Sequence, residues 1–175
     1  MRREFLIAGA GGQGVVTAGR ILAEALFLEG YYVVFTRSYG SEARTGYTRA
    51  EVVATEGFAY DMGVREPDSS LIMTRSAWRR WGGRLRSGGV LVADRRVEGV
   101  LDRHDLLIVT LPLLKVGEEL GAAFLGTAAG LGALSEVCGL PSVDSLLRAS
   151  GRVLGERAGP TREAIVRGSR LARER

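Results

Sequence analysis

Six residues near the amino terminus, Gly9-Ala10-Gly11-Gly12-Gln13-Gly14, have the composition of a phosphate-binding turn. Gly9, Gly11 and Gly14 match the G-x-G-x-x-G spacing of dinucleotide-binding proteins. Glycine lets the backbone turn sharply and lets an anion approach the free N–H groups at the start of a helix. We therefore take Gly9, Gly11, Gly12, Gln13 and Gly14 as candidate cofactor-binding residues. A tight strand-to-helix turn that binds nothing is the alternative interpretation.

A second polar segment, residues 38–46, follows the next apolar run and reads Ser-Tyr-Gly-Ser-Glu-Ala-Arg-Thr-Gly. Parallel sheets bind ligands in loops at the carboxyl ends of their strands. We therefore expect this loop to lie near the glycine turn, which adds a second group of candidate cofactor-binding residues: Arg37, Ser38, Tyr39, Glu42, Arg44 and Gly46. From spacing alone, a solvated loop with a local ion pair between Glu42 and Arg44 is an equally good interpretation.

The end of the second apolar run bears on which cofactor could bind. An NAD-binding domain commonly ends this strand with Asp or Glu, which holds a ribose hydroxyl. Here the chain reads Thr36-Arg37-Ser38, and an arginine suits a phosphate better than a ribose. This weakens the assignment of an NAD site and leaves NADP, coenzyme A or a role without phosphate binding open.

The elements around these segments alternate between strands and helices. The chain begins with an apolar strand at 4–8 and a helix at 15–28, and the continuous apolar run 31–35 indicates a parallel strand covered on both faces. Alternating residues 48–55, the turn Glu56-Gly57 and residues 58–62 predict an antiparallel hairpin. Further strands are expected at 70–74, 90–93 and 106–109, with helices at 77–85, 121–140, 142–154 and 160–171.

This pattern predicts an α/β fold in one domain spanning 1–175. It would be a Rossmann-like three-layer domain, with a mostly parallel sheet, an inserted antiparallel hairpin and C-terminal helices. Glycine and alanine residues in 121–140 would let that late helix approach a neighbour closely, in the core or at a subunit interface. Trp78 and Trp81 are expected to pack or to line an interface.

Several classes of chemistry are excluded by what the sequence lacks. Cys138 and His104 are the only cysteine and the only histidine, so this chain alone cannot form a disulfide, a zinc site or an iron–sulfur site. They lie far apart in sequence, which leaves no hydrolytic triad and no catalytic residue to assign. The longest uncharged run, 120–135, is shorter than the ~20 residues of a membrane helix. We expect a cytoplasmic protein that binds neither membrane nor nucleic acid.

The motifs together resemble those of a known family. Gly9-Ala-Gly-Gly-Gln-Gly14-Val, Leu22-Ala-Glu24-Ala, and Tyr39-Gly40 followed by Glu42-x-Arg44-x-Gly46 are similar to the gamma subunits of 2-oxoacid:acceptor (ferredoxin) oxidoreductases. Pro67-Asp68 and Leu131-Gly132-Ala133-Leu134 also fit. The chain departs from the family in two places, because Thr127-Ala128-Ala129 and Thr161-Arg162 stand where asparagine is frequent.

The resemblance implies a subunit of an enzyme that decarboxylates pyruvate, 2-oxoglutarate, ketoisovalerate or indolepyruvate to an acyl-CoA. Thiamine diphosphate, Mg²⁺ and iron–sulfur clusters are then expected on alpha and beta subunits and a ferredoxin-like delta subunit. This chain would contribute to assembly and would be inactive alone, binding no cofactor tightly. It would contact coenzyme A through Gly11 to Gly14 with Arg37 or Arg44 nearby. Self-association into a homodimer when isolated stays open.

Two other functions are compatible with the sequence. One is a free-standing NAD(P)- or flavin-binding oxidoreductase, which would bind a dinucleotide without partners. The other is an assembly or nucleic-acid-binding module that uses the arginine-rich segment 75–96, whose binding would fall steeply with salt.

The coenzyme A assignment makes a testable prediction about Arg44. Replacing it (Arg44→Ala) should raise the Michaelis constant of the assembled enzyme for coenzyme A, because a cation beside the phosphates is lost. Steady-state kinetics with coenzyme A as the varied substrate provide the measurement. An unchanged Michaelis constant and an unchanged turnover would exclude this role for Arg44.

Overall fold

The computed structural model describes residues 1–39, 46–58, 60–61 and 63–175. Its centre is a six-stranded sheet with the order β2-β3-β1-β4-β5-β6, in which β1 pairs in parallel with β4, β4 with β5 and β5 with β6. β3 is antiparallel to both of its neighbours. The strands are β1 (Arg2–Ala10), β2 (Tyr32–Tyr39), β3 (Tyr47–Thr55), β4 (Ser69–Ile72), β5 (Val90–Asp94) and β6 (Leu107–Leu111).

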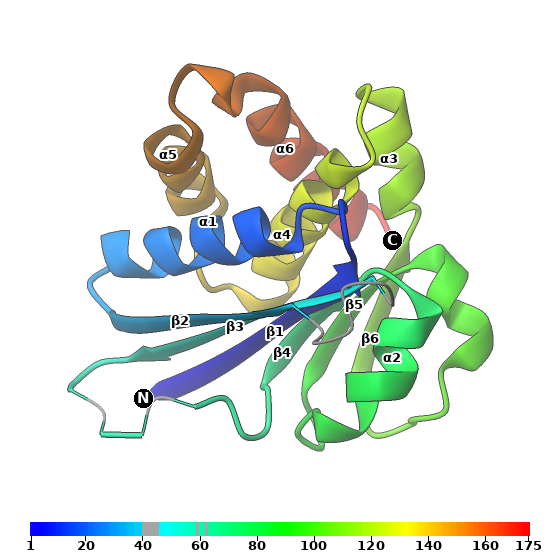
Figure 1. The fold of residues 1–175 in the computed structure, drawn as a ribbon, viewed down its shortest axis with the longest axis horizontal. Helices are drawn as coiled ribbons and strands as arrows, with labels where there is room; N and C mark the ends of the chain where they lie inside the picture. The colour runs from blue at the N-terminus through cyan, green and yellow to red at the C-terminus, as the bar shows by residue number, and fades with distance from the viewer. Residues whose placement is uncertain (40–45, 59, 62) are drawn as a thin grey trace.

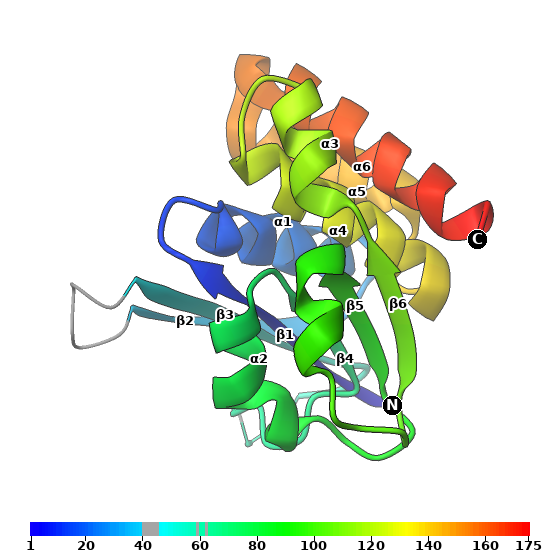
Figure 2. The same cartoon turned by 90° about the vertical axis from the view of Figure 1, so that its right-hand side faces the viewer.

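Helices cover the sheet unequally. Figures 1 and 2 show a thin helical layer on one face of the sheet and a thicker one on the opposite face. The thin layer contains α2 (Arg75–Trp81), which continues into a 3₁₀ turn at Gly82–Arg84. The thick layer contains α1 (Val15–Leu28), α3 (Leu113–Glu119), α4 (Phe124–Cys138), α5 (Val143–Leu154) and α6 (Gly159–Arg173). Two more 3₁₀ segments lie at Arg95–Val100 and Gly155–Ala158.

Each helical layer packs on its own hydrophobic core. The larger core joins α1 and α4–α6 to residues such as Phe5, Ile7 and Val52 on one side of the sheet. The smaller core places Trp78 and Trp81 against Leu6 and other strand residues on the opposite side. Both tryptophans are buried, which agrees with the first of the two predicted alternatives, packing within the chain. The α/β fold with a mostly parallel sheet and an antiparallel section is therefore confirmed, as are the helix at 15–28 and the C-terminal helices.

The pairing predicted for the antiparallel hairpin is wrong. Residues 48–55 do form a strand, but β3 pairs with β2 and β1. Among the described residues of 58–62, none lies in a strand, and the Phe58 and Tyr60 side chains are 75% and 96% exposed. Alternation along one strand identifies which face is buried but does not identify the partner strand, and this is why the sequence pattern assigned the wrong neighbour.

The predicted character of the second strand is also corrected. β2 is an edge strand, antiparallel to its only neighbour in the sheet, β3. It runs parallel to β1, as expected for two strands joined through α1, but β3 lies between them. Tyr32 is 58% exposed, so the strand is not covered on both faces. β2 also extends to Tyr39, which places Ser38 and Tyr39 within the strand rather than in the predicted loop 38–46.

The helical layer depends on direct backbone contact between α4 and α6. A Cβ added at Gly132 would overlap the carbonyl oxygen of Ile165, and one added at Gly168 would overlap that of Ala129. α4 is buried from Leu125 to Ser135, which confirms the predicted close approach and places it inside this chain.

Replacing Gly168 (Gly168→Ala) should therefore destabilise the fold strongly. The backbones of α4 and α6 would have to separate to admit the methyl group, at a cost of about 3 kcal/mol. For a chain of this size that corresponds to a fall of roughly 6–12 °C in Tm, measurable by calorimetry. Gly83→Ala is the matched control, because a Cβ at Gly83 meets nothing within 4 Å. Equal Tm values for the two variants would contradict the packing described.

Candidate functional site

The glycine turn between β1 and α1 is held by its own backbone and by one side chain. The amide oxygen of Gln13 accepts a hydrogen bond from the Ala10 N–H at 2.7 Å, and the Gly11 N–H donates to the Gly46 carbonyl at 2.6 Å. A Cβ at Gly9 would lie 2.5 Å from that Gln13 oxygen. Gly9 is therefore needed so that the Gln13 side chain can fold back over the end of β1.

The start of α1 is left without a side-chain cap. Gly14 is the N-cap residue in a left-handed conformation (φ 74°), and the first helical hydrogen bond runs from the Ala18 N–H to the Gly14 carbonyl. Within the described part of the chain, five N–H groups here have no hydrogen-bond partner: those of Gly12, Gly14, Val15, Val16 and Thr17. Such groups, together with the positive end of the helix dipole, favour an anion.

Gly12 lies at the open side of this turn. Its φ of 80° is in the left-handed region, and none of the described residues lies within 4 Å of the position that a Cβ would take. At Gly11 the one neighbour of this position among the described residues is the Gly46 carbonyl oxygen, at 3.9 Å. An incoming group could thus contact the backbone directly at both residues.

The structure brings part of the second predicted group to the turn. Gly46 contacts the turn through its hydrogen bond with Gly11. Arg37 lies farther away, because it pairs with Ala50 of β3, and Ala50 pairs in turn with Ile7 of β1. At the usual spacing of strands, the backbones of Arg37 and Ile7 are about 10 Å apart across the sheet. Ser38 and Tyr39 are also strand residues. Glu42 and Arg44 lie outside the described residues.

The amino end of α4 is attached to the turn, a contact that motif reasoning missed. The Thr127 hydroxyl donates a hydrogen bond of 2.5 Å to the Gln13 carbonyl. A Cβ at Gly14 would lie 3.0 Å from the Cβ of Phe124, the first residue of α4. The signal in the sequence was that Thr127-Ala128-Ala129 stands where asparagine is frequent, and nothing in that departure indicates which segment Thr127 contacts.

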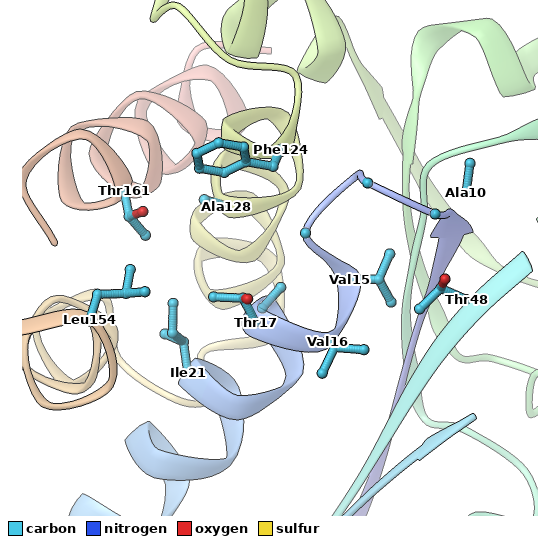
Figure 3. Close-up of a pocket in the computed structure, with 14 residues that line it drawn as sticks. Ala10, Val15, Val16, Thr17, Ile21, Thr48, Phe124, Ala128, Leu154 and Thr161 are labelled. Atoms are coloured by element: carbon cyan, nitrogen blue, oxygen red, sulfur yellow. The ribbon is translucent and has the colours of Figure 1, made fainter. Parts of the chain in front are cut away.

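A cavity of about 480 Å³ opens beside the turn (Figure 3). Most of its wall is apolar, and α1, α4, α5 and α6 all contribute to it. The lining residues are Ala10, Gly11, Gly12, Gly14, Val15, Val16, Thr17, Ala18, Ile21, Thr48, Phe124, Ala128, Leu154 and Thr161. The phosphate-capable turn thus borders a cavity within the range of ~300–1,000 Å³ common for small-molecule sites.

Other features of the described residues bear on catalysis. These residues contain no cluster of three or more His, Cys, Asp or Glu side chains that could hold a metal ion. Cys138 lies partly buried with its Sγ 3.2 Å from the Ser69 hydroxyl oxygen, and burial raises the pKa of its thiol. A thiol with a raised pKa is a poor nucleophile near neutral pH. None of the described helices is both long and apolar enough to cross a membrane.

Comparison with known proteins identifies the family. Residues 4–171 match the model of the family described as pyruvate ferredoxin/flavodoxin oxidoreductase. A 2-oxoglutarate synthase subunit, KorC, from Methanothermobacter marburgensis is 35% identical over 151 residues, which is 82% of this chain and 81% of that protein.

Two solved structures share the fold. One is the gamma subunit of a keto/oxoacid ferredoxin oxidoreductase from Geobacter sulfurreducens, with a TM-score of 0.86 and 27% identity over 99% of both chains. The other is 2-oxoglutarate:ferredoxin oxidoreductase from Magnetococcus marinus, described with 2-oxoglutarate, coenzyme A and succinyl-CoA bound. The chain covers 31% of that protein at 21% identity, with a TM-score of 0.85, and this match shows the fold alone.

Proteins of this family are parts of thiamine- and iron–sulfur-dependent oxidoreductase complexes. Residues 4–171 match the family model, and 99% of the chain aligns with 99% of a gamma subunit, which places it among the gamma-type subunits of such complexes. The chain belongs to the pyruvate ferredoxin/flavodoxin oxidoreductase family, as a gamma-type subunit of a 2-oxoacid:ferredoxin oxidoreductase.

Proposed function

We propose that this subunit binds coenzyme A at the glycine turn and presents it to partner subunits that hold thiamine diphosphate, Mg²⁺ and the iron–sulfur clusters. The observation that carries the proposal is the set of N–H groups at the uncapped start of α1, those of Gly12, Gly14 and Val15 to Thr17, which have no partner among the described residues. A diphosphate matches these donors in charge and in hydrogen bonding. Gly11 and Gly12, which lack side chains, leave the backbone open to it.

The assignment of the other cofactors to partner subunits follows from the ligand residues that this chain lacks. With one cysteine and one histidine it cannot ligate an iron–sulfur cluster. The described residues offer no carboxylate cluster for the Mg²⁺ that accompanies thiamine diphosphate. The subunit would therefore bind and orient the acyl acceptor, while the thiol attacks an acyl group formed on another chain. Its partners would be alpha and beta subunits and a ferredoxin-like delta subunit in the cytoplasm.

Coenzyme A is preferred to other phosphate ligands for two reasons. The related 2-oxoglutarate:ferredoxin oxidoreductase from Magnetococcus marinus is described with coenzyme A bound, and its fold includes this domain. In addition, β2 carries no acid at its end that could hold the ribose of NAD, since the strand closes with Thr36-Arg37-Ser38-Tyr39. Arg37 lies on the edge strand β2, on the same side of the sheet as Ala50 and Ile7, which pack beneath α1.

A side chain at Gly12 should weaken coenzyme A binding. In the assembled enzyme, Gly12→Ala is expected to raise the Michaelis constant for coenzyme A roughly tenfold, the size of one lost charge-assisted hydrogen bond. The Michaelis constant for the oxoacid should stay unchanged, because that substrate reacts on another subunit. Steady-state kinetics with each substrate varied in turn separate the two effects.

Gly88→Ala supplies the matched control for this experiment. Gly88 has nearly the same φ, 77°, and its Cβ would likewise meet nothing within 4 Å. The two variants should therefore lose similar stability from backbone strain, about 1 kcal/mol. The proposal is wrong if Gly12→Ala leaves the Michaelis constant for coenzyme A at the value of the Gly88→Ala enzyme.

A further inference from the structure

The arginine-rich segment 75–96 has no part in the coenzyme A site. It contains seven arginines and a single acid, Asp94. Four of the arginines bond to the chain itself: Arg75 to the Arg96 carbonyl, Arg84 to Glu51, Arg86 to Asp68 and Arg96 to Asp94. Arg80 lies over the rings of Tyr47 and Trp81. Arg79 and Arg95 are exposed, and neither has an ion pair or hydrogen bond with any described residue.

Arg79 and Arg95 belong to neighbouring elements. α2 packs against the 3₁₀ segment Arg95–Val100, and both views of the fold show the two side by side (Figures 1 and 2). Across this contact, the Arg75 Nε donates a hydrogen bond of 2.6 Å to the Arg96 carbonyl. Arg75 lies one helical turn before Arg79 on α2. We call this surface the arginine face, and its residues, all exposed, are Arg75, Arg79, Arg80, Arg95 and Arg96.

The chain does little to balance the charge of the arginine face. The acids next to it already bond to other groups: Asp94 to Arg96, Asp102 to the Trp78 indole and Glu98 to the Thr110 hydroxyl. α2 has no acid in its first turn, where one would suit the helix dipole. Arg75 and Arg79 are four residues apart, a spacing at which like charges repel. Folding alone does not favour this arrangement, whereas an acidic surface outside the chain would.

The composition of the arginine face fits a protein that binds transiently. Stable subunit interfaces bury apolar side chains, and none of the exposed large apolar side chains among the described residues lies on α2 or on Arg95–Val100. Nucleic-acid bases would stack on exposed aromatic rings, but Trp78 and Trp81 are buried. Clustered arginines attract carboxylates over long distances and bind them through planar guanidinium groups. The matching partner is therefore an acidic protein.

The arginine face lies near the edge of the sheet that carries the glycine turn. α2 follows the carboxyl end of β4, and Arg95–Val100 follows that of β5. The Arg80 guanidinium is 5.3 Å from the centre of the Tyr47 ring, and Tyr47 pairs with Ala10 at the end of β1. Because α1 and α2 pack on opposite sides of the sheet, a protein on the arginine face would leave the cavity beside the turn open.

The reaction of the family includes a protein substrate that binds and leaves in each catalytic cycle, since a 2-oxoacid:ferredoxin oxidoreductase passes its electrons to ferredoxin. We propose that the arginine face docks this ferredoxin through acidic side chains on the ferredoxin, with Arg79 and Arg95 as contact residues. The electrons come from a cluster on a partner chain, and this subunit supplies the charge that attracts and orients the acceptor. The inference rests on the family assignment and is independent of the coenzyme A site.

Steady-state kinetics of the assembled enzyme, with a purified acidic ferredoxin as the varied substrate, test the proposal. The double variant Arg79→Gln, Arg95→Gln should raise the KM for ferredoxin roughly fivefold and should make it less sensitive to salt, because two screened attractions are lost. Methyl viologen, a small dye that takes electrons without docking on this face, should be reduced at the unaltered rate. The KM values for the oxoacid and for coenzyme A should also stay unchanged.

Matched variants separate the effect of charge from other effects. Arg79→Lys with Arg95→Lys keeps both charges, and should hold the KM for ferredoxin within about twofold of the unaltered enzyme. Arg148→Gln removes another exposed arginine without a partner among the described residues, from α5 in the opposite helical layer. It should leave the KM for ferredoxin unchanged. If the double glutamine variant lowers Tm, the two single variants replace it, and each should raise this KM roughly twofold.

Three results would overturn the inference. The first is a KM for ferredoxin that the glutamine variants leave unchanged at both low and high salt. The second is loss of the variant chain from the purified complex with its own Tm unaltered, which would make the arginine face a permanent subunit interface. The third is binding of a short DNA duplex that the glutamine variants abolish while ferredoxin kinetics stay intact, which would assign the face to nucleic acid.

Discussion

The backbones of α4 and α6 touch where the two helices cross, and the rest of the helical layer depends on this contact. Gly132 and Gly168 allow it, because any side chain at either position would overlap a carbonyl oxygen of the opposite helix. With α4 so deeply buried, its amino end is fixed over the end of β1. There Thr127 and Phe124 meet Gln13 and Gly14 of the turn. The packing of α4 thus holds the candidate site on one side, and the end of strand β1 holds it on the other.

The turn itself shows how glycine is used differently at neighbouring positions. Gly9 makes room for the Gln13 side chain, and Gly14 makes room for Phe124, so both serve packing. A Cβ at Gly12, where φ is positive, would contact none of the described residues, and one at Gly11 would meet Gly46 alone among them. The functional candidates are therefore Gly11 and Gly12, together with the N–H groups of the first turn of α1. Gln13, whose amide oxygen bonds within the turn, acts as a positioning residue.

The sequence predicted the local elements well and the long-range contacts poorly, for physical reasons. The helix at 15–28 was recognisable because a glycine turn precedes it and Gly30 follows it. Such start and stop signals lie within a few residues of the helix ends, so they can be recognised without knowing the tertiary structure. The partner of β3 was not recognisable, since alternation marks a buried face and leaves the neighbouring strand undetermined. Thr161 illustrates the same limit at the site. It lies far from the glycine motif in sequence, and only the packing of α6 brings it to the cavity.

The most direct test of the account is to observe the N–H groups of the turn while coenzyme A binds. Titration of the ¹⁵N-labelled chain with coenzyme A, followed by amide chemical shifts, reports each backbone N–H separately. The account predicts that the largest changes occur at Gly12, Gly14 and Val15 to Thr17, with Gly88 and the exposed face of α2 unaffected. Changes confined to α2, or to any surface remote from the turn, would contradict it.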